Sequence, residues 1–237
     1  MPMHEREAAH TFKKMALFDG LPQSTRERYE HACSWRRYKR EEQIIDRLSD
    51  THDVFFVVEG SVRIVNFSLS GREVAFGDLH AGEFFGELAA VDGKPRSASA
   101  VATSSTLLAI MPPDIFRSMM AEHPPIALAI MRRLAKIVRV ATGRIMDLST
   151  LGAYDRVCAE LLRMARPSLK PDGTARIKPI PNHSDIASRV STARETVARV
   201  LADLSRQNLV TRESDALFVR NFAGLEQSLP ELGESLE

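Results

Sequence analysis

The sequence predicts an α+β fold in three parts: a β-roll over residues 1–122, a long helix with a hinge over 123–151, and a winged helix-turn-helix with an acidic tail over 152–237. Three observations lead to this prediction. Short β-rich runs separated by glycines fill residues 34–111, and the apolar period then changes from that of a strand to that of a helix. Beyond residue 183, two short helical patterns flank a tight turn.

Composition describes a soluble globular chain of 237 residues, 44% hydrophobic and 27% charged. Its longest apolar runs are far shorter than the roughly 18 residues that a membrane span needs. The first residues lack the apolar stretch of an export signal, so we expect a cytoplasmic protein with no membrane contact. Cys33 and Cys158 fall in different predicted domains, and the seven histidines lack metal-ligand spacing. We therefore expect neither a disulfide framework nor a metal site.

The net charge of +1 conceals an uneven distribution. Residues 152–220 hold twelve Arg and Lys against eight Asp and Glu, a surplus of four, whereas residues 221–237 hold four Glu and no Lys or Arg. A basic segment followed by an acidic tail is compatible with a nucleic-acid-binding protein. Surpluses this small also occur in many enzymes, so the charge distribution is only a weak indication.

The β-rich segment begins with two apolar runs, Val54–Val58 and Val62–Val65, on either side of the turn signal Glu59-Gly60. Four further apolar runs follow, separated by glycines: Val74–Phe76, Phe84-Phe85, Ala98–Val101 and Leu107–Ile110. Strands of this length, with a glycine every few residues, are typical of a compact β-roll or barrel.

The long helix is indicated by apolar residues spaced three or four apart over about 25 residues, a period that belongs to one face of a helix. The residues of this stripe are Ile130, Leu134, Ile137, Ala141, Ile145 and Leu148. Such a narrow seam usually packs against a second copy of itself, so we predict a homodimer joined along 130–148. The alternative is that the stripe packs on its own β-roll. Residues 149–152 end the helix and are the predicted hinge.

The segment after the hinge predicts a helix over Ala153–Ala165, stopped by Pro167, and a short strand over Ile177–Ile180. Near the end of the chain, Leu209–Thr211 and Leu217–Val219 indicate a β-hairpin. Such a hairpin is the wing of a winged helix-turn-helix.

The helix-turn-helix itself begins at His183. Ala187 supplies a small residue where the two helices cross, and Ser191–Ala193 supplies the turn. Thr192 and Glu195 have the S/T-x-x-E spacing of a capping box, which predicts the start of the second helix. Six apolar residues supply the buried faces of the two helices: Ile186, Val190, Val197, Val200, Leu201 and Leu204.

The opposite face of the second helix carries Arg194, Glu195 and Arg199 near its start, where a recognition helix meets base edges in the major groove. The arginine fork matches the two acceptors of guanine, and glutamate can accept from the amino group of cytosine. The alternative is an exposed helix with ordinary surface charges. Because three such side chains cluster at one helix end, we predict double-stranded DNA as a partner.

A second informative stretch runs from Phe85 to Ala102. A cyclic nucleotide presents a phosphodiester anion, which suits a guanidinium and a hydroxyl, and a ribose 2′-hydroxyl, which suits a carboxylate. Arg96, Ser97 and Glu87 supply these groups, and Gly86 allows close approach of the backbone. From spacing alone, a surface ion pair between Glu87 and Arg96 would be the better interpretation.

A family resemblance favours the nucleotide. Gly86-Glu87-Leu88, followed after seven residues by Arg96-Ser97-Ala98, resembles the phosphate-binding cassette of cyclic-nucleotide-binding domains. Residues 194–199, Arg-Glu-Thr-Val-Ala-Arg, resemble the recognition helix of the CRP/FNR superfamily of transcription regulators. Since both matches occur in the right order and at the right distance, the chain is identified as a member of that superfamily over about residues 12–222, close to its cyclic-nucleotide-responsive branch.

The resemblance implies roles for the cassette residues. Glu87 would bind the ribose hydroxyl, Arg96 and Ser97 the cyclic phosphate, and backbone amides near Gly86 and Leu88 would assist. The expected allosteric ligand is cyclic AMP, with cyclic GMP as an open alternative.

The choice of base is open because the long helix departs from the family pattern. The positions that face the purine fall at Ala141 and Thr142, and only Thr142 keeps a hydroxyl. The helix arginine that the family places near the cassette glutamate falls at Ile137.

For the DNA-binding segment, the resemblance implies that Arg194, Glu195, Thr196 and Arg199 read a TGTGA-like half-site in each arm of a palindrome. Ala193 replaces a small hydroxyl residue, which removes one phosphate contact. RNA polymerase is the implied protein partner.

Other functions are weighed by what the sequence lacks. Iron–sulfur sensors of the superfamily need an N-terminal cysteine cluster, and heme-based sensors need an axial ligand pair; neither occurs, although His80 lies in the relevant loop. We therefore expect no iron–sulfur cluster and no heme. A regulator of the same fold that answers another small ligand, or is constitutively active, is the first alternative. A nucleotide-using enzyme such as a phosphodiesterase is the second; because no nucleophile–base pair accompanies Glu87 and Arg96, we predict no enzymatic activity.

Overall fold

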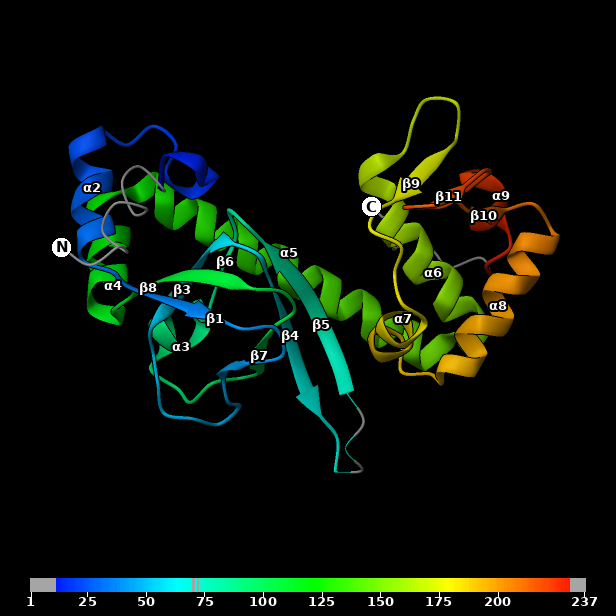
Figure 1. Cartoon of the computed structure of the whole chain (residues 1–237), viewed down its shortest axis with the longest axis horizontal. Helices are drawn as coiled ribbons and strands as arrows, with labels where there is room; N and C mark the ends of the chain where they lie inside the picture. The colour runs from blue at the N-terminus through cyan, green and yellow to red at the C-terminus, as the bar shows by residue number, and fades with distance from the viewer. Residues whose placement is uncertain (1–11, 70, 72, 231–237) are drawn as a thin grey trace. The chain divides into compact units, whose positions relative to one another are not determined.

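The computed structural model describes residues 12–230 except 70 and 72, and the chain divides into two compact units, Met1–Ala135 and Lys136–Glu237 (Figure 1). Residues 1–11 and the last part of the acidic tail, residues 231–237, lie outside the described residues. Within the described ranges, no helix is both long and apolar enough to cross a bilayer.

The first unit is a β-roll, as predicted. Its described residues form two four-stranded antiparallel sheets, ordered β1-β8-β3-β6 and β2-β7-β4-β5. The strands are β1 Ser34–Tyr38, β2 Gln43–Ile45, β3 Val54–Glu59, β4 Ser61–Phe67, β5 Glu73–His80, β6 Phe84–Phe85, β7 Ser99–Ala102 and β8 Thr106–Met111.

Strand β3 is apolar along most of its length because both of its faces are buried. Successive side chains of a strand point to opposite sides. Val54 and Phe56 join one core cluster, and Phe55 and Val57 join another. The turn to β4 needs Gly60, since its φ is +82° and an added Cβ would clash with the main chain of Ser105.

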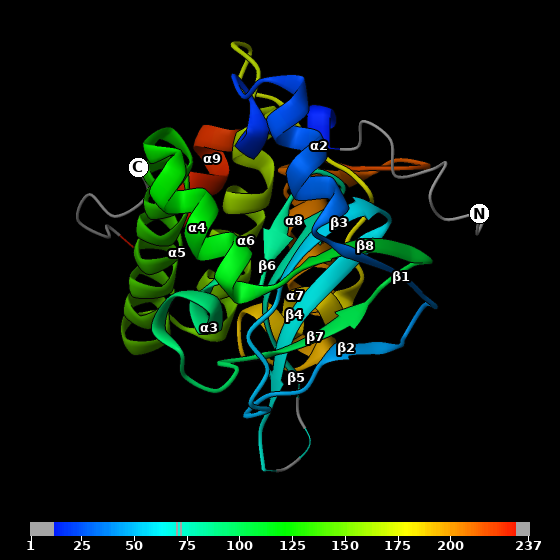
Figure 2. The ribbon, with the colours of Figure 1, turned by 90° about the vertical axis from the view of Figure 1, so that its left-hand side faces the viewer.

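Helices cover one side of the roll. Their bounds are η1 Phe12–Lys14, η2 Ala16–Phe18, α2 Gln23–His31, α3 Glu87–Asp92, α4 Pro113–Glu122 and α5 Pro124–Thr150. The rings of Phe12 and Phe18 stack at 4.1 Å between centroids, and Phe56 of β3 packs against Phe12 at 5.1 Å. Figure 2 shows α3 beside α4, and a hydrogen bond of 2.9 Å from Arg117 to the carbonyl of Ala90 links the two helices.

The long helix α5 extends over 27 residues, in agreement with the predicted length of about 25, but its apolar stripe has two destinations. Ile130 is only 2% exposed and lies in the core of its own β-roll, and Leu134 packs against the same cluster. Ile130 and Leu134 thus pack within their own unit, and the dimer contact predicted along the stripe stays a prediction. Ile137, Ile145 and Leu148 are exposed. Helical periodicity identifies an apolar face, but it does not say what covers each turn.

The second unit is a winged helix-turn-helix, as predicted. Its elements are α6 Ala153–Ala165, η3 Arg166–Ser168, β9 Ala175–Ile177, α7 His183–Arg189, α8 Arg194–Arg206, β10 Val210–Arg212, β11 Leu217–Val219 and α9 Phe222–Gln227. The three strands form an antiparallel sheet ordered β10-β11-β9, and one apolar core joins it to α6, α7, α8 and α9.

Three local predictions for this unit need correction. Strand β9 lies at Ala175–Ile177 instead of the predicted Ile177–Ile180, and it ends early because Pro179 lacks the N–H that a strand would use. The first part of the segment predicted as an acidic tail is a helix, α9, which buries Phe222 and Leu225. The prediction of a capping box formed by Thr192 and Glu195 is also wrong. The N-cap of α8 is Ala193, one residue later than predicted. Ser191 has a φ of +52°, and the turn between α7 and α8 is therefore longer than the sequence pattern indicated.

Candidate functional site

The cassette begins where β6 ends and α3 starts. Gly86 occupies this junction with a φ of +87°, a conformation that favours glycine. An added Cβ would lie 2.7 Å from Nη1 of Arg96 and 2.9 Å from the carbonyl oxygen of Asp53. Gly86 is therefore needed both for the turn and for the close approach of the arginine.

Arg96 is held below the surface by three hydrogen bonds. Its side chain donates from Nε to Oγ1 of Thr51 at 3.0 Å, from Nη1 to the carbonyl of Gly86 at 2.9 Å and from Nη2 to the carbonyl of Asp53 at 2.8 Å. The residue is 2% exposed, and burial lowers the pKa of its guanidinium. Three of its five N–H donors are thus used, and no partner for the other two lies among the described residues. A fixed, buried cation with spare donors suits an anionic ligand.

Glu87, the first residue of α3, supplies the opposite charge. Its side chain is 6% exposed, and burial raises the pKa of its carboxyl, while a backbone hydrogen bond and the charges of Arg133 and Arg96 offset part of that rise. The cassette therefore brings together a guanidinium, a carboxylate and a left-handed glycine turn. These groups match a cyclic phosphate and a ribose hydroxyl.

Arg133 is a functional candidate that the sequence interpretation missed. It lies on α5 one turn before Ile137, and its Nε is 3.9 Å from Oε1 of Glu87. Its Nη2 donates to the carbonyl of Phe84 at 2.6 Å, and its guanidinium lies 4.5 Å from the centre of the Phe84 ring. The family places a helix arginine near the cassette glutamate, but this chain has Ile137 at that position. The resemblance therefore predicted no arginine beside Glu87. The structure supplies one from the preceding turn, which the spacing of four residues could have indicated.

The remaining predicted ligand residues are more open. Ser97 is exposed, and its carbonyl accepts a hydrogen bond of 3.3 Å from Asn66. Leu88 is exposed on α3, and Thr142 is exposed on α5 in the second unit. The structure thus brings Gly86, Glu87 and Arg96 together, and the assignment of Thr142 stays a prediction. No sequence pattern marked Thr51 or Asp53, which lie more than forty positions from Arg96 in the chain.

The predicted recognition face lies on α8. Val197, Val200 and Leu204 are buried in the core of the second unit. The side chains predicted to read DNA lie away from this buried face: Arg194, Glu195 and Arg199 are exposed and Thr196 is half-buried. Nη2 of Arg199 donates to Oγ1 of Thr196 at 3.4 Å. The helix therefore presents polar groups at its N-terminal end, while its apolar side fixes it to the domain.

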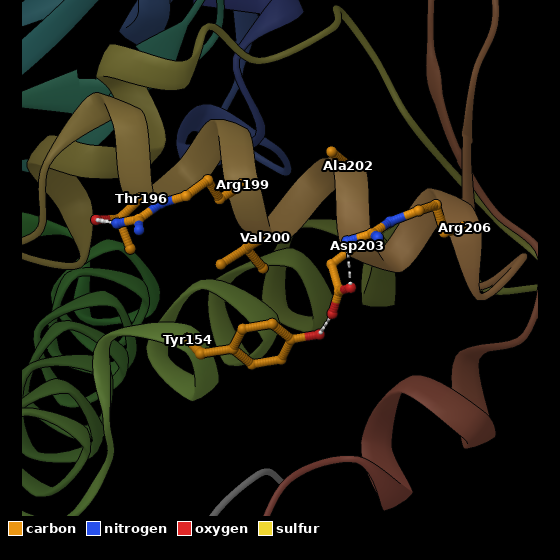
Figure 3. Close-up of a pocket in the computed structure, with 7 residues that line it drawn as sticks. All are labelled: Tyr154, Thr196, Arg199, Val200, Ala202, Asp203 and Arg206. Atoms are coloured by element: carbon orange, nitrogen blue, oxygen red, sulfur yellow. Dashed lines mark hydrogen bonds and ion pairs between the residues drawn. The ribbon is translucent and has the colours of Figure 1, made fainter.

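A hollow of about 470 Å³ lies beside this face, between α8 and the start of α6 (Figure 3). It is lined by Tyr154, Thr196, Arg199, Val200, Ala202, Asp203 and Arg206. The Tyr154 hydroxyl donates to Oδ2 of Asp203 at 2.9 Å, and Arg206 donates to Oδ1 at 2.9 Å. Burial and the Asp203 hydrogen bond raise the pKa of Tyr154 to about 12, so the phenol keeps its proton. The Tyr154–Asp203 bond fixes the distal half of α8 to α6, and Arg206 holds the Asp203 carboxylate from within α8.

Two family models match the chain. Residues 35–123 match the cyclic nucleotide-binding domain, and residues 155–228 match the Crp-like helix-turn-helix domain. The first range contains the whole cassette, and the second contains both helices of the helix-turn-helix together with the wing.

Relatives match most of the chain. The cyclic AMP receptor protein of Thermus thermophilus is 33% identical over 174 residues, which are 73% of this chain and 78% of that protein. The cAMP-activated global transcriptional regulator CRP of Salmonella typhimurium is 27% identical over 206 residues, covering 84% of this chain and 97% of the relative.

Solved structures agree with these matches. The catabolite activator protein of Thermus thermophilus is similar with a TM-score of 0.52 and 30% identity, over 89% of this chain and 96% of that chain. A CooA mutant from Carboxydothermus hydrogenoformans has a TM-score of 0.74 over 84% of this chain and 88% of that chain; at 21% identity, it shows likeness of fold alone. With its cyclic-nucleotide-binding β-roll, long helix and Crp-like helix-turn-helix, the chain belongs to the CRP/FNR family of transcription regulators.

Proposed function

We propose that this regulator binds cyclic AMP in its β-roll and, as a homodimer, then binds a palindrome of TGTGA-like half-sites. The single observation that supports this proposal most is the buried guanidinium of Arg96, whose Nη1 donates at 2.9 Å to the carbonyl of Gly86, the residue before Glu87. A buried arginine with spare donors is costly unless an anion completes its shell.

In the proposed complex, Arg96 and Ser97 bind the cyclic phosphate together with amides near Gly86 and Leu88. Glu87 accepts from the ribose 2′-hydroxyl, and the charge of Arg133 favours its ionised carboxylate by lowering the pKa of that group. Thr142 contacts the purine. Because a single hydroxyl discriminates weakly between purine edges, cyclic GMP is the second nucleotide to test.

On DNA, the two recognition helices of a dimer would enter successive major grooves about 34 Å apart, with Arg194, Glu195, Thr196 and Arg199 near the bases. RNA polymerase is the protein partner that such a regulator requires. A function of this kind includes no catalytic step.

The dimer would form along the exposed face of α5. Met131, Val138 and Ile145 are 57%, 63% and 62% exposed and recur every seven residues, the spacing of a coiled-coil seam. Ala141, Ile137 and Leu148 flank this seam, so the proposed interface keeps four of the six residues predicted from the sequence.

A second candidate is a regulator of the same fold that answers another small ligand or none. Ala141 in place of a threonine and Ile137 in place of an arginine favour it, since both remove polar groups from the helix that would face a purine.

Calorimetric titration with cyclic AMP and cyclic GMP, on the chain and on Arg96→Gln, distinguishes the two candidates. We expect micromolar or tighter binding of cyclic AMP, and a loss of about 10–100-fold in Arg96→Gln from the missing charged hydrogen bonds. Arg28→Gln is the matched control, because Arg28 lies in the same unit and pairs with Glu122 at the surface. If neither nucleotide binds, or if Arg96→Gln binds cyclic AMP with undiminished affinity, the second candidate is favoured.

A further inference from the structure

Glu160 of α6 lies at the centre of a cluster of charged side chains in the second unit. The residue is 2% exposed, and its carboxylate contacts guanidinium groups from three helices. The distances are 3.5 Å to Nη2 of Arg144 on α5, 3.1 Å to Nη1 of Arg163 on α6 and 3.3 Å to Nη1 of Arg189 on α7. One buried carboxylate thus connects the end of the long helix to the first helix of the helix-turn-helix.

A second buried carboxylate strengthens this connection. Asp147 of α5 is 8% exposed and pairs with Arg163, the same arginine that contacts Glu160. Removing one partner of a buried ion pair leaves a desolvated charge, which costs far more than the loss of a surface pair. Displacing the end of α5 from α6 is therefore unfavourable.

Arg156, one turn before Glu160 on α6, adds hydrogen bonds at both connections. Its Nη1 donates at 2.9 Å to the carbonyl of Leu151, just after α5, and its Nε donates at 2.9 Å to the carbonyl of Val190, just after α7. The side chains of Leu151 and Val190 are also buried in the apolar core of the second unit. Helix α6 thus holds both the end of α5 and the turn that precedes α8.

The same turns of α5 belong to the proposed dimer seam and its flank. Arg144 and Asp147 are three residues apart, so they lie on one face of the helix, and Ile145 and Leu148 have the same spacing on the neighbouring face. In the proposed dimer, these last turns contact the second copy on one face and α6 on the next. The position of each DNA-reading unit is then fixed relative to the seam.

A palindrome demands a fixed distance between the two recognition helices. Each base pair added between the half-sites moves one of them by about 3.4 Å along the duplex and rotates it by about 35°. A dimer whose recognition helices are firmly joined to the seam fits one such spacing, whereas a loosely joined pair can follow several.

We propose that Glu160 is a positioning residue that fixes the half-site spacing of this regulator, because it holds α5, α6 and α7 together beside the dimer seam. As a buried residue it contacts no base and acts through Arg144 and Arg189. The inference rests on the proposed dimer and its palindrome, and it adds the residue that decides which spacings are accepted. The reading of each half-site stays with α8, whose packing depends on the apolar core and on the Tyr154–Asp203 hydrogen bond.

Anisotropy titrations on a series of duplexes, with and without cyclic AMP, test this role. Each duplex carries two TGTGA-like half-sites with centres about 9 to 12 base pairs apart, around one helical turn. We expect the unmodified chain to prefer one spacing. In Glu160→Gln, the ratio of affinities between the best spacing and its neighbours should fall by about tenfold, the effect of losing one charged hydrogen bond, while affinity for a single half-site stays unchanged.

Asp147→Asn, which removes the second carboxylate between α5 and α6, should give the same loss and serves as the test should Glu160→Gln not fold. Glu226→Gln is the matched control, because Glu226 pairs with Arg166 at the surface of the same unit; we expect it to keep the spacing preference. Thermal unfolding and sedimentation velocity confirm that each variant is folded and dimeric.

An unchanged spacing preference in Glu160→Gln and Asp147→Asn would overturn the positioning role alone. An equal loss of affinity for single half-sites and for palindromes of every spacing would also overturn it, since Glu160 would then support the fold of the unit and not its position. If the unmodified chain does not distinguish the palindromes from a scrambled duplex, the proposed function fails together with the positioning role.

Discussion

The position of Arg96 depends on groups that are distant in the chain. Thr51 and the carbonyl of Asp53 approach it from one loop, and the carbonyl of Gly86 approaches it from the turn before α3. Because these acceptors are fixed before any ligand arrives, the guanidinium does not lose its conformational freedom on binding. Preorganisation of this kind makes the ion pair with a phosphate more favourable.

Thr51→Val removes one acceptor and keeps the shape of the side chain. We expect nucleotide affinity to fall by about 2–10-fold, the value of one neutral hydrogen bond, with the preference between cyclic AMP and cyclic GMP unchanged. Calorimetry measures both quantities. Thr103→Val is the control, since the Thr103 hydroxyl contacts Ser61 instead; an equal loss in that variant would argue against a role for Thr51.

Glu87 should make stability depend on pH. Burial raises its pKa above the ordinary value of 4.5, so above that pH the folded state binds more protons than the unfolded state and stability falls as pH rises. Glu87→Gln removes this effect. We expect the variant to be more stable than the parent at pH 7, with a difference that shrinks as pH falls towards 4.5.

Urea unfolding followed by fluorescence of Trp35, the single tryptophan, measures this effect in the first unit. If the free energies of unfolding of the parent and of Glu87→Gln depend equally on pH, the Glu87 carboxylate is as well stabilised in the folded protein as in water.

At the scale of elements, the sequence predicts local structure well and partners poorly. The bounds of α6 and the length of α5 follow from periodicity and proline, and Gly86, Glu87 and Arg96 belong to one short motif. Arg133 comes from another element, and only its spacing of four residues from Ile137 could have indicated it. In the α5 stripe, Ile130 is buried and Ile145 is exposed. Periodicity does not predict this difference, because it depends on which turns of α5 pack on the β-roll.

The exposed turns of α5 carry a prediction about assembly. Val138→Glu places a carboxylate in the centre of the proposed seam, opposite the same residue of a second copy, where it is both desolvated and repelled. We expect a dimer for the unmodified chain and a monomer for the variant in sedimentation velocity. Arg139→Glu changes the neighbouring residue off the seam and should stay dimeric; dissociation in both variants would indicate a general effect of charge.

Helix α8 carries a prediction about sequence reading. Arg199→Ala should cost about 1–3 kcal/mol on a TGTGA-like site and relax the preference at one base pair. Arg206→Ala, at the other end of the helix, should not alter base preference. Fluorescence anisotropy on single-base variants of the site measures both. A uniform loss over all sequences in Arg199→Ala would make Arg199 a phosphate contact.

At the scale of the whole molecule, two compact units share one long helix, and a ligand in the first can influence the second only by binding one state of the protein more tightly than another. Within the second unit, the ion pairs of Glu160 and the hydrogen bonds of Arg156 connect the end of α5 to α6, α7 and the turn before α8.

The central claim, nucleotide-dependent recognition of a palindrome, is tested most directly by one titration. A labelled duplex with two TGTGA-like half-sites is titrated with the full-length chain in the absence of nucleotide, with cyclic AMP and with cyclic GMP, and a scrambled duplex is the control. We predict that cyclic AMP tightens binding to the palindrome by about 5–150-fold, the usual range of allosteric coupling, and leaves the scrambled duplex unaffected. Equal affinity for the palindrome under all three conditions would contradict it.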